Sequence, residues 1–219
     1  LLDKKILNLL FTTFCILVVI NGSNFMDGLN TLTAGYCLLI LFSLIFMFSN
    51  NKIIIPNYDL LLITVVSLLV VFLFNIFGKM YLGDNGAYLA AFIISILLIK
   101  ISNINHIVSP FYVANLLWYP AFENFFSIIR KIIQKKSPMS PDNHHLHQLL
   151  FAYFNKNRNF NKVFVNSFTA CVINSFNFII FAFATMYYSN TKIQILIILI
   201  SIFFYNLFYF ILKKKFIIN

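Results

Sequence analysis

Residues Leu60–Phe77 read LLLITVVSLLVVFLFNIF and include no charged side chain. The run is close to the roughly 20 apolar residues with which a helix crosses a bilayer. It is too long and too uniformly apolar for a strand, and a helix satisfies its own backbone groups in lipid. The stretch therefore predicts a transmembrane helix and, with it, an all-α fold.

Further apolar runs lie on both sides of this stretch. Together they predict spans at Ile6–Ile20, Leu32–Phe48, Leu60–Phe77, Ala87–Ile101, Ile107–Ile128, Val163–Tyr188 and Ile193–Leu212. Composition agrees, because only 10% of the 219 residues are charged, against about 25% in a soluble domain. We therefore expect a polytopic helical bundle of about seven transmembrane helices, with residues 1–219 as one membrane domain.

The ends and the cysteines of the chain limit other interpretations. Leu1 leads almost directly into the first expected span, without the pattern of a signal peptide. We read the chain as the C-terminal part of a longer protein, or as a product of processing or truncation. The three cysteines lie in apolar runs without a C-x-x-C pair, so neither a disulfide framework nor a zinc site is expected.

Basic residues are divided unevenly between the two sides of the membrane. With seven crossings, one side receives Asn21–Asn30, Gly78–Gly86, the loop 129–162 and the C-terminal tail. That side holds 11 of the 16 lysines and arginines, and the other side holds 5. The positive-inside rule places the richer side in the cytoplasm.

Four polar stretches belong to the cytoplasmic side. They are Asn21–Asn30 (NGSNFMDGLN), Gly83–Gly86 (GDNG), Pro120–Lys131 (PAFENFFSIIRK) and Ser137–Leu150 (SPMSPDNHHLHQLL). Each has a structural interpretation: helix caps in the first two, ordinary packing in the third, and a solvated basic loop in the fourth. In the third stretch, Arg130 and Lys131 are expected to snorkel to the level of the lipid phosphates.

The functional interpretation of these stretches is a phosphate site. Asp84 would lie at a helix N-terminus, where anions are favoured, and a carboxylate among phosphates suits Mg²⁺. His145 and His147 would share one side of an extended loop. We expect both imidazoles to face one hollow near Asp84, with His144 pointing elsewhere. Because a neutral imidazole keeps one donor, activity should persist above about pH 6.5.

In this order, the four stretches resemble the polyprenyl-phosphate N-acetylhexosaminyl-1-phosphate transferases. The resemblance implies a bacterial inner-membrane enzyme that moves a sugar 1-phosphate from a UDP-N-acetylhexosamine to undecaprenyl or another polyprenyl phosphate. It further implies release of UMP, dependence on Mg²⁺ and a role in starting a cell-envelope glycan. No nucleic-acid partner is implied, and a homodimer is left open.

The resemblance also implies roles for single residues. Asn24 and Asp27 match the part of the first motif that helps form the nucleotide-sugar site. Asp84 matches the magnesium-binding aspartate. His145 and His147 match the histidines that contact the substrate diphosphate.

Three positions depart from the family pattern. Asn30 stands in place of a second aspartate, Asn143 in place of an arginine, and Gln148 in place of a further histidine. Asn143 and Gln148 keep hydrogen bonding without charge, so both are expected among the substrate contacts, together with Arg130 through its charge. The family's adjacent Asp-Asp pair does not occur in these 219 residues, so part of the metal and acceptor site is expected outside this chain.

Two alternatives remain. A truncated or degenerate homologue would bind a lipid phosphate or a partner without turnover, and the departures above favour it. A helical transporter or channel would use the basic loop only for orientation. Against the transporter, no expected span has a charged pair in its interior, and Pro and Gly rarely interrupt the spans.

Overall fold

The computed structural model describes residues 5–135, 137, 144–156 and 160–217, with side chains described as far as Lys215. Within these ranges the chain forms helices and no strand. The helices are α1 (Lys5–Met26), α2 (Leu32–Ser49), α3 (Tyr58–Ile76), α4 (Gly83–Ile104), α5 (Pro110–Leu116), α6 (Trp118–Ile133), α7 (Leu146–Phe154), α8 (Lys162–Met186) and α9 (Thr191–Ile217).

The all-helical membrane fold expected from the sequence is confirmed. Among the described residues, six helices are long and apolar enough to cross a membrane: α1, α2, α3, α4, α8 and α9 as far as Lys215. The first span is longer than expected, because α1 continues past Ile20 to Met26. Most of the first polar stretch is therefore helix rather than loop.

The fifth expected span, Ile107–Ile128, is not a single helix. α5 ends at Leu116 and α6 begins at Trp118, with Leu117 between them at φ −110° and ψ 6°. The hydroxyl of Tyr36 from α2 lies at this break, where it donates to the Leu116 carbonyl oxygen at 2.9 Å and accepts the Tyr119 N–H at 3.4 Å. It thereby satisfies backbone groups that the break leaves without helical partners.

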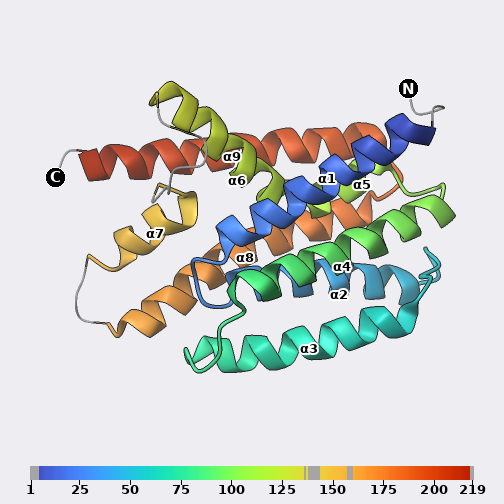
Figure 1. The fold of residues 1–219 in the computed structure, drawn as a ribbon, viewed down its shortest axis with the longest axis horizontal. Helices are drawn as coiled ribbons and strands as arrows, with labels where there is room; N and C mark the ends of the chain where they lie inside the picture. Colours follow the sequence, from blue (N-terminus) through green and yellow to red (C-terminus); the bar gives the residue numbers. More distant parts are fainter. Residues whose placement is uncertain (1–4, 136, 138–143, 157–159, 218–219) are drawn as a thin grey trace.

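This break corrects the expected count of seven uninterrupted spans. One crossing is made by two shorter helices, α5 and α6, which together lead the chain from one end of the bundle towards the other (Figure 1). It also removes one argument against a transporter, because that argument rested on uninterrupted spans.

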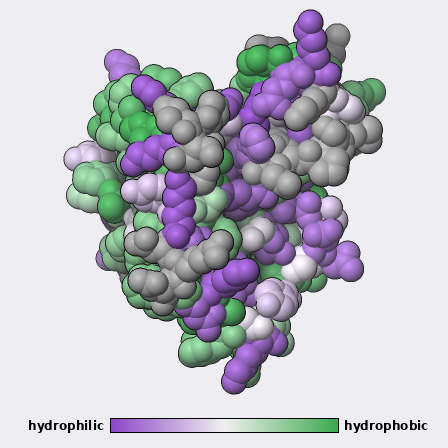
Figure 2. Space-filling model, turned by 90° about the vertical axis from the view of Figure 1, so that its left-hand side faces the viewer, coloured by the Kyte–Doolittle hydropathy of each residue, from purple (hydrophilic) through white to green (hydrophobic). Residues whose placement is uncertain are grey.

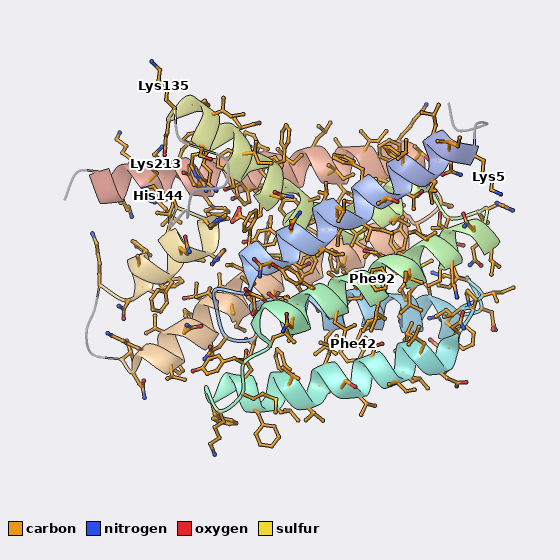
Figure 3. The ribbon with its side chains drawn as sticks, viewed as in Figure 1. Lys5, Phe42, Phe92, Lys135, His144 and Lys213 are labelled. Carbon is orange, nitrogen blue, oxygen red and sulfur yellow. The ribbon has the colours of Figure 1, made fainter. Side chains whose placement is uncertain are left out.

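The connections between the helices alternate between the two ends of the molecule (Figure 1). One end, here called the motif end, holds the turns 27–31 and 77–82, helix α7 and the last turns of α9. Figure 2 views this end, where hydrophilic side chains gather. Lys135, His144 and Lys213 lie there, whereas Lys5 lies at the opposite end (Figure 3). The described parts of the polar stretches therefore meet on one side, as the alternation of spans predicts.

Close packing of α1 against α6 and α4 positions the residues of the motif end. Where α1 crosses α6, a Cβ atom on Gly22 would come within 2.0 Å of the Pro120 carbonyl oxygen. Only glycine lets the two backbones approach this closely. The most buried candidate span is α2, which packs against α8 and α3.

Candidate functional site

Two carboxylates from distant parts of the sequence line one cavity of about 500 Å³ at the motif end. Asp27 lies in the turn between α1 and α2, and Asp84 lies in the first turn of α4. Asn30, Lys162 and Asn166 also line this space, which we call the aspartate cavity. The Oδ1 atom of Asn166 accepts the Asn30 N–H at 2.5 Å, so the start of α8 is tied to the turn that holds Asp27.

The helix-cap interpretation of the first two polar stretches is wrong. Asp84 is exposed and follows Gly83, whose φ of 67° suits glycine. Leu82 occupies the N-cap position of α4, and Thr31 occupies that of α2. In the described chain no side chain caps either helix by a hydrogen bond. Asp84 and Asp27 are therefore available for another role.

The two carboxylates affect one another. Burial and the nearby charge of Asp84 raise the pKa of Asp27 to about 6, although the Thr33 side chain and the Gly83 backbone offset part of the shift. A cation between them would relieve both the burial cost and the repulsion.

The oxygen-rich aspartate cavity fits Mg²⁺. This ion prefers hard oxygen ligands and is usually held by one or two carboxylates together with substrate phosphates. Among the described residues, no group of three or more His, Cys, Asp or Glu side chains could hold a metal. Asp27 and Asp84 therefore suit a substrate-assisted magnesium site better than a closed structural metal site.

A second polar cluster lies where α6, α7 and α9 meet. Glu123 of α6 is fully buried, and its Oε1 atom accepts the Leu146 N–H at 3.1 Å. Its Oε2 atom accepts the hydroxyl of Tyr205 from α9. The Nδ1 atoms of His145 and His147 lie 3.5 Å and 3.7 Å from Oε1. We call these four side chains, Glu123, His145, His147 and Tyr205, the glutamate cluster.

The two histidines of this cluster lie with their rings side by side. The ring centroids are 5.5 Å apart and the planes differ by 15°. Both side chains are buried, whereas His144 is exposed, as expected. Burial lowers the pKa of His147 below its ordinary value, and the carboxylate of Glu123 opposes this shift only in part.

The expectation of a single hollow shared by Asp84 and both histidines is wrong. Neither imidazole lines the aspartate cavity. The two sites adjoin instead at Gly28, where an added Cβ atom would come within 2.8 Å of His147 Nε2. Gly28 follows Asp27 and lines the aspartate cavity. The glutamate cluster therefore lies next to this cavity, on the other side of Gly28.

The remaining predicted site residues are placed as follows. Arg130 is 6% exposed, with Phe126 and Tyr209 each 5.6 Å from its guanidinium, so the expected snorkelling is wrong. The same holds for Lys131, which is 5% exposed.

Two predicted contact residues have backbone partners. The Oε1 atom of Gln148 accepts the His145 N–H at 3.1 Å and so fixes the start of α7. Asn24 lies near the end of α1, and its carbonyl oxygen accepts the Asp27 N–H at 3.1 Å. Asn143 lies outside the described residues.

Sequence reasoning missed the central residue of the glutamate cluster. The segment Pro120–Lys131, which contains Glu123, predicts only ordinary packing. The available signal was its scarcity, because the chain has only six Asp and Glu residues and this one falls in an apolar segment. Tyr205 gave no signal, since it is one of 11 tyrosines in the chain.

Comparisons with known proteins agree with the motifs. Glycosyl transferase family 4 matches residues 2–102, which include Asp27 and Asp84. A Bacillus subtilis (strain 168) protein, described as a probable undecaprenyl-phosphate N-acetylglucosaminyl 1-phosphate transferase, is 33% identical over 149 residues. The match covers 65% of this chain and 40% of the relative's length, so the chain spans well under half of that protein.

No solved structure matches the chain. The family match, the relative and the order of the motifs agree. Over residues 2–102, a little under half of its length, the chain is similar to glycosyl transferase family 4.

Proposed function

We propose that the full-length protein transfers N-acetylhexosamine 1-phosphate from a UDP-sugar to polyprenyl phosphate, giving a polyprenyl-diphosphate sugar and UMP. The observation that carries the proposal is the aspartate cavity, in which Asp27 and Asp84 come together at the motif end. The name of the Bacillus subtilis relative describes a reaction of this class.

The chemistry explains why such a cavity is needed. The lipid phosphate attacks the β-phosphorus of the UDP-sugar, so two anions approach while negative charge develops on the departing UMP. Catalysis then depends on positioning and on neutralising charge. Asp27 and Asp84 would hold Mg²⁺, which when bound would neutralise charge on the diphosphate. Lys162, which lines the same cavity, would add a positive charge.

A second cavity supports the binding of a lipid acceptor. An apolar cavity of about 900 Å³ lies between α2, α3 and α8, with Phe42, Phe72 and Phe168 in its wall. Val163 lines both this cavity and the aspartate cavity. We propose that the apolar cavity accommodates part of the prenyl chain while the phosphate reaches the carboxylates.

We further propose a multi-pass location in the bacterial inner membrane with the motif end in the cytoplasm, where UDP-sugars are made. The family's Asp-Asp pair would come from sequence outside this chain. A homologue that binds lipid phosphate without turnover is the second candidate, favoured by the lack of that pair in these 219 residues.

The decisive experiment compares two Asp→Asn variants of the full-length protein. Asp84→Asn removes an anionic metal ligand and should lower the rate of UMP release by about two orders of magnitude or more, with only partial rescue by added Mg²⁺. UMP release is measured in detergent with UDP-N-acetylglucosamine and undecaprenyl phosphate.

Asp59→Asn is the matched control, because Asp59 is also exposed in the first turn of a helix, α3, but at the end opposite the motif end. Its activity should stay near that of the wild type. Near-normal activity of Asp84→Asn would contradict the metal assignment. A folded wild-type protein that binds lipid phosphate without releasing UMP would favour the non-catalytic homologue.

A further inference from the structure

The glutamate cluster fixes where the imidazole protons lie. A carboxylate only accepts hydrogen bonds, and the Nδ1 atoms of His145 and His147 both face Oε1 of Glu123, at 3.5 Å and 3.7 Å. A lone pair on either Nδ1 would repel the carboxylate in this buried place. A proton on each Nδ1 atom removes this repulsion.

For a neutral imidazole this arrangement leaves Nε2 without a proton. The proton on Nδ1 is the only one in the neutral ring, so Nε2 presents a lone pair. Arg130 of α6 supplies a positive charge that acts on His147 and disfavours a second cation there. The other ionisable groups close to Glu123 are Tyr119 of α6 and Tyr205 of α9, and the Tyr205 hydroxyl donates to Oε2 of Glu123.

We propose that Glu123 is a positioning residue that holds the proton of His147 on Nδ1, so that His147 Nε2 serves the substrate as a hydrogen-bond acceptor. The inference rests on the proposed function for its substrate. It differs from the expected role, in which this histidine donates to a phosphate oxygen, because the one donor of the neutral ring is directed at Glu123.

The surroundings of Nε2 support an acceptor that awaits a ligand. The His147 side chain has no exposed surface, and among the described residues neither of its ring nitrogens has a hydrogen-bond partner, but Nδ1 has the Glu123 carboxylate 3.7 Å away whereas Nε2 has no such group beside it. This atom faces Gly28, beside the aspartate cavity. A buried nitrogen without a partner is unfavourable unless something else satisfies it.

The chemistry of this nitrogen restricts the ligand group that it binds. An ionised phosphate oxygen would meet a lone pair and be repelled. The group must bring its own proton, and the substrates offer two sources: a hydroxyl or amide N–H of the sugar, or the P–OH of the lipid phosphate monoester. Both sources share the chemistry of an O–H or N–H donor.

The first test determines which ring nitrogen of each histidine carries the proton. ¹⁵N NMR of the full-length protein with labelled histidine distinguishes Nδ1–H from Nε2–H rings, and His106→Gln and His144→Gln variants assign the two exposed histidines. We expect Nδ1–H rings for His145 and His147, with conversion to Nε2–H in Glu123→Leu. Replacing a buried ionic group by an apolar side chain of similar volume often preserves the fold.

The isosteric Glu123→Gln variant keeps the test decisive if the leucine variant does not fold. Its amide offers both an acceptor and a donor, so at least one of the two rings should change its tautomer. Tyr205→Phe removes the partner of Oε2 and leaves the contacts of Oε1, so it should keep both Nδ1–H rings. Nε2–H rings in the wild type, or unchanged rings in Glu123→Gln, would overturn the proposal.

Kinetics then test the role of Nε2. Loss of an outer partner that orients a metal-ligating histidine typically costs 10–100-fold, and by analogy Glu123→Gln should lower kcat/KM by about that factor. Gly28→Ala should cause a similar loss, because its methyl group displaces His147 Nε2. A larger KM for the UDP-sugar would assign the bound donor to the sugar, and a larger KM for the lipid would assign it to P–OH.

If the wild type shows Nδ1–H rings but no transfer, the positioning role stands while the proposed function fails. Normal kcat/KM in Glu123→Gln with altered tautomers would show that the acceptor does not serve the reaction.

Discussion

Asp27 illustrates how one half-buried carboxyl group links stability to metal binding. Its pKa of about 6 lies above the value of about 3.9 expected in the unfolded chain. A raised pKa means that folding favours the protonated form. The group therefore contributes stability below about pH 4, and this contribution is lost as the pH rises through about 6.

This linkage predicts the behaviour of Asp27→Asn in chelator-treated protein. At pH 7.5 the variant should be more stable than the wild type by about 1–2 kcal/mol, a value reduced to allow for partial solvent screening. At pH 4 the difference should vanish, because the wild-type carboxyl is then protonated. Thermal unfolding, monitored by intrinsic fluorescence, measures the stability difference at both pH values.

Two comparisons make this result specific. Mg²⁺ should stabilise the wild type at pH 7.5 and have little effect on Asp27→Asn. Asp59→Asn, at the opposite end, should show neither effect. Equal stability of Asp27→Asn and the wild type at both pH values would mean that the carboxyl is solvated rather than buried.

At the scale of helices, the crossing of α1 and α6 determines where the glutamate cluster lies. A methyl group on Gly22 has no room, since the atom 2.0 Å away belongs to the Pro120 backbone and cannot rotate aside. Gly22→Ala should therefore destabilise the protein by about 1–3 kcal/mol, as overpacking in close contacts does. The loss should appear in thermal unfolding and, through displacement of α6, in transfer activity.

Gly86→Ala is the matched control for this prediction. An added Cβ there would come within 2.9 Å of the Leu82 side chain, which can move aside. The change lies in α4, where alanine is also a better helix former than glycine. We expect little loss of stability. Equal stability of both variants would show that α1 and α6 can separate without cost.

The helices also show what the sequence could and could not predict. Apolar length sufficed for α2, α3, α4, α8 and α9, because crossing a bilayer depends mainly on local composition. The break at Leu117 could not be predicted, because the group that satisfies it is Tyr36, 80 residues earlier in the chain.

The candidate site, too, could be predicted from the sequence only in part. Asp27 and Asp84 were found from short motifs at helix ends, and alternation of the spans brings them to one side. The glutamate cluster was missed because it depends on how α6, α7 and α9 pack. Local spacing placed His145 and His147 on a common side, but nothing local indicated that they would face Glu123.

For the whole molecule, the distribution of charge predicts which end faces the cytoplasm. Lys135 and Asn51 are both exposed residues with positive φ, and they belong to connections at opposite ends of the bundle. A cysteine at position 135 should be protected from an impermeant thiol reagent in intact cells, and one at position 51 should react. Mass-shift labelling in a background without Cys15, Cys37 and Cys171 measures this difference.

Permeabilised cells provide the control, since both cysteines should then react. The reverse pattern in intact cells would place the aspartate cavity outside, away from UDP-sugars. That result would contradict the proposed function while leaving the helical fold unchanged.

The divided crossing has a consequence for biosynthesis. α5 rises only about 10 Å, so it cannot insert alone into a hydrocarbon layer about 30 Å thick. It must enter together with α6, which brings Glu123. Because His145, His147 and Tyr205 follow Glu123 in the chain, none of them has been polymerised when Glu123 is added. At about 5–20 residues per second, Tyr205 is made about 4–16 s later. The nascent chain therefore holds this carboxylate without its complete set of partners until α9 is synthesised.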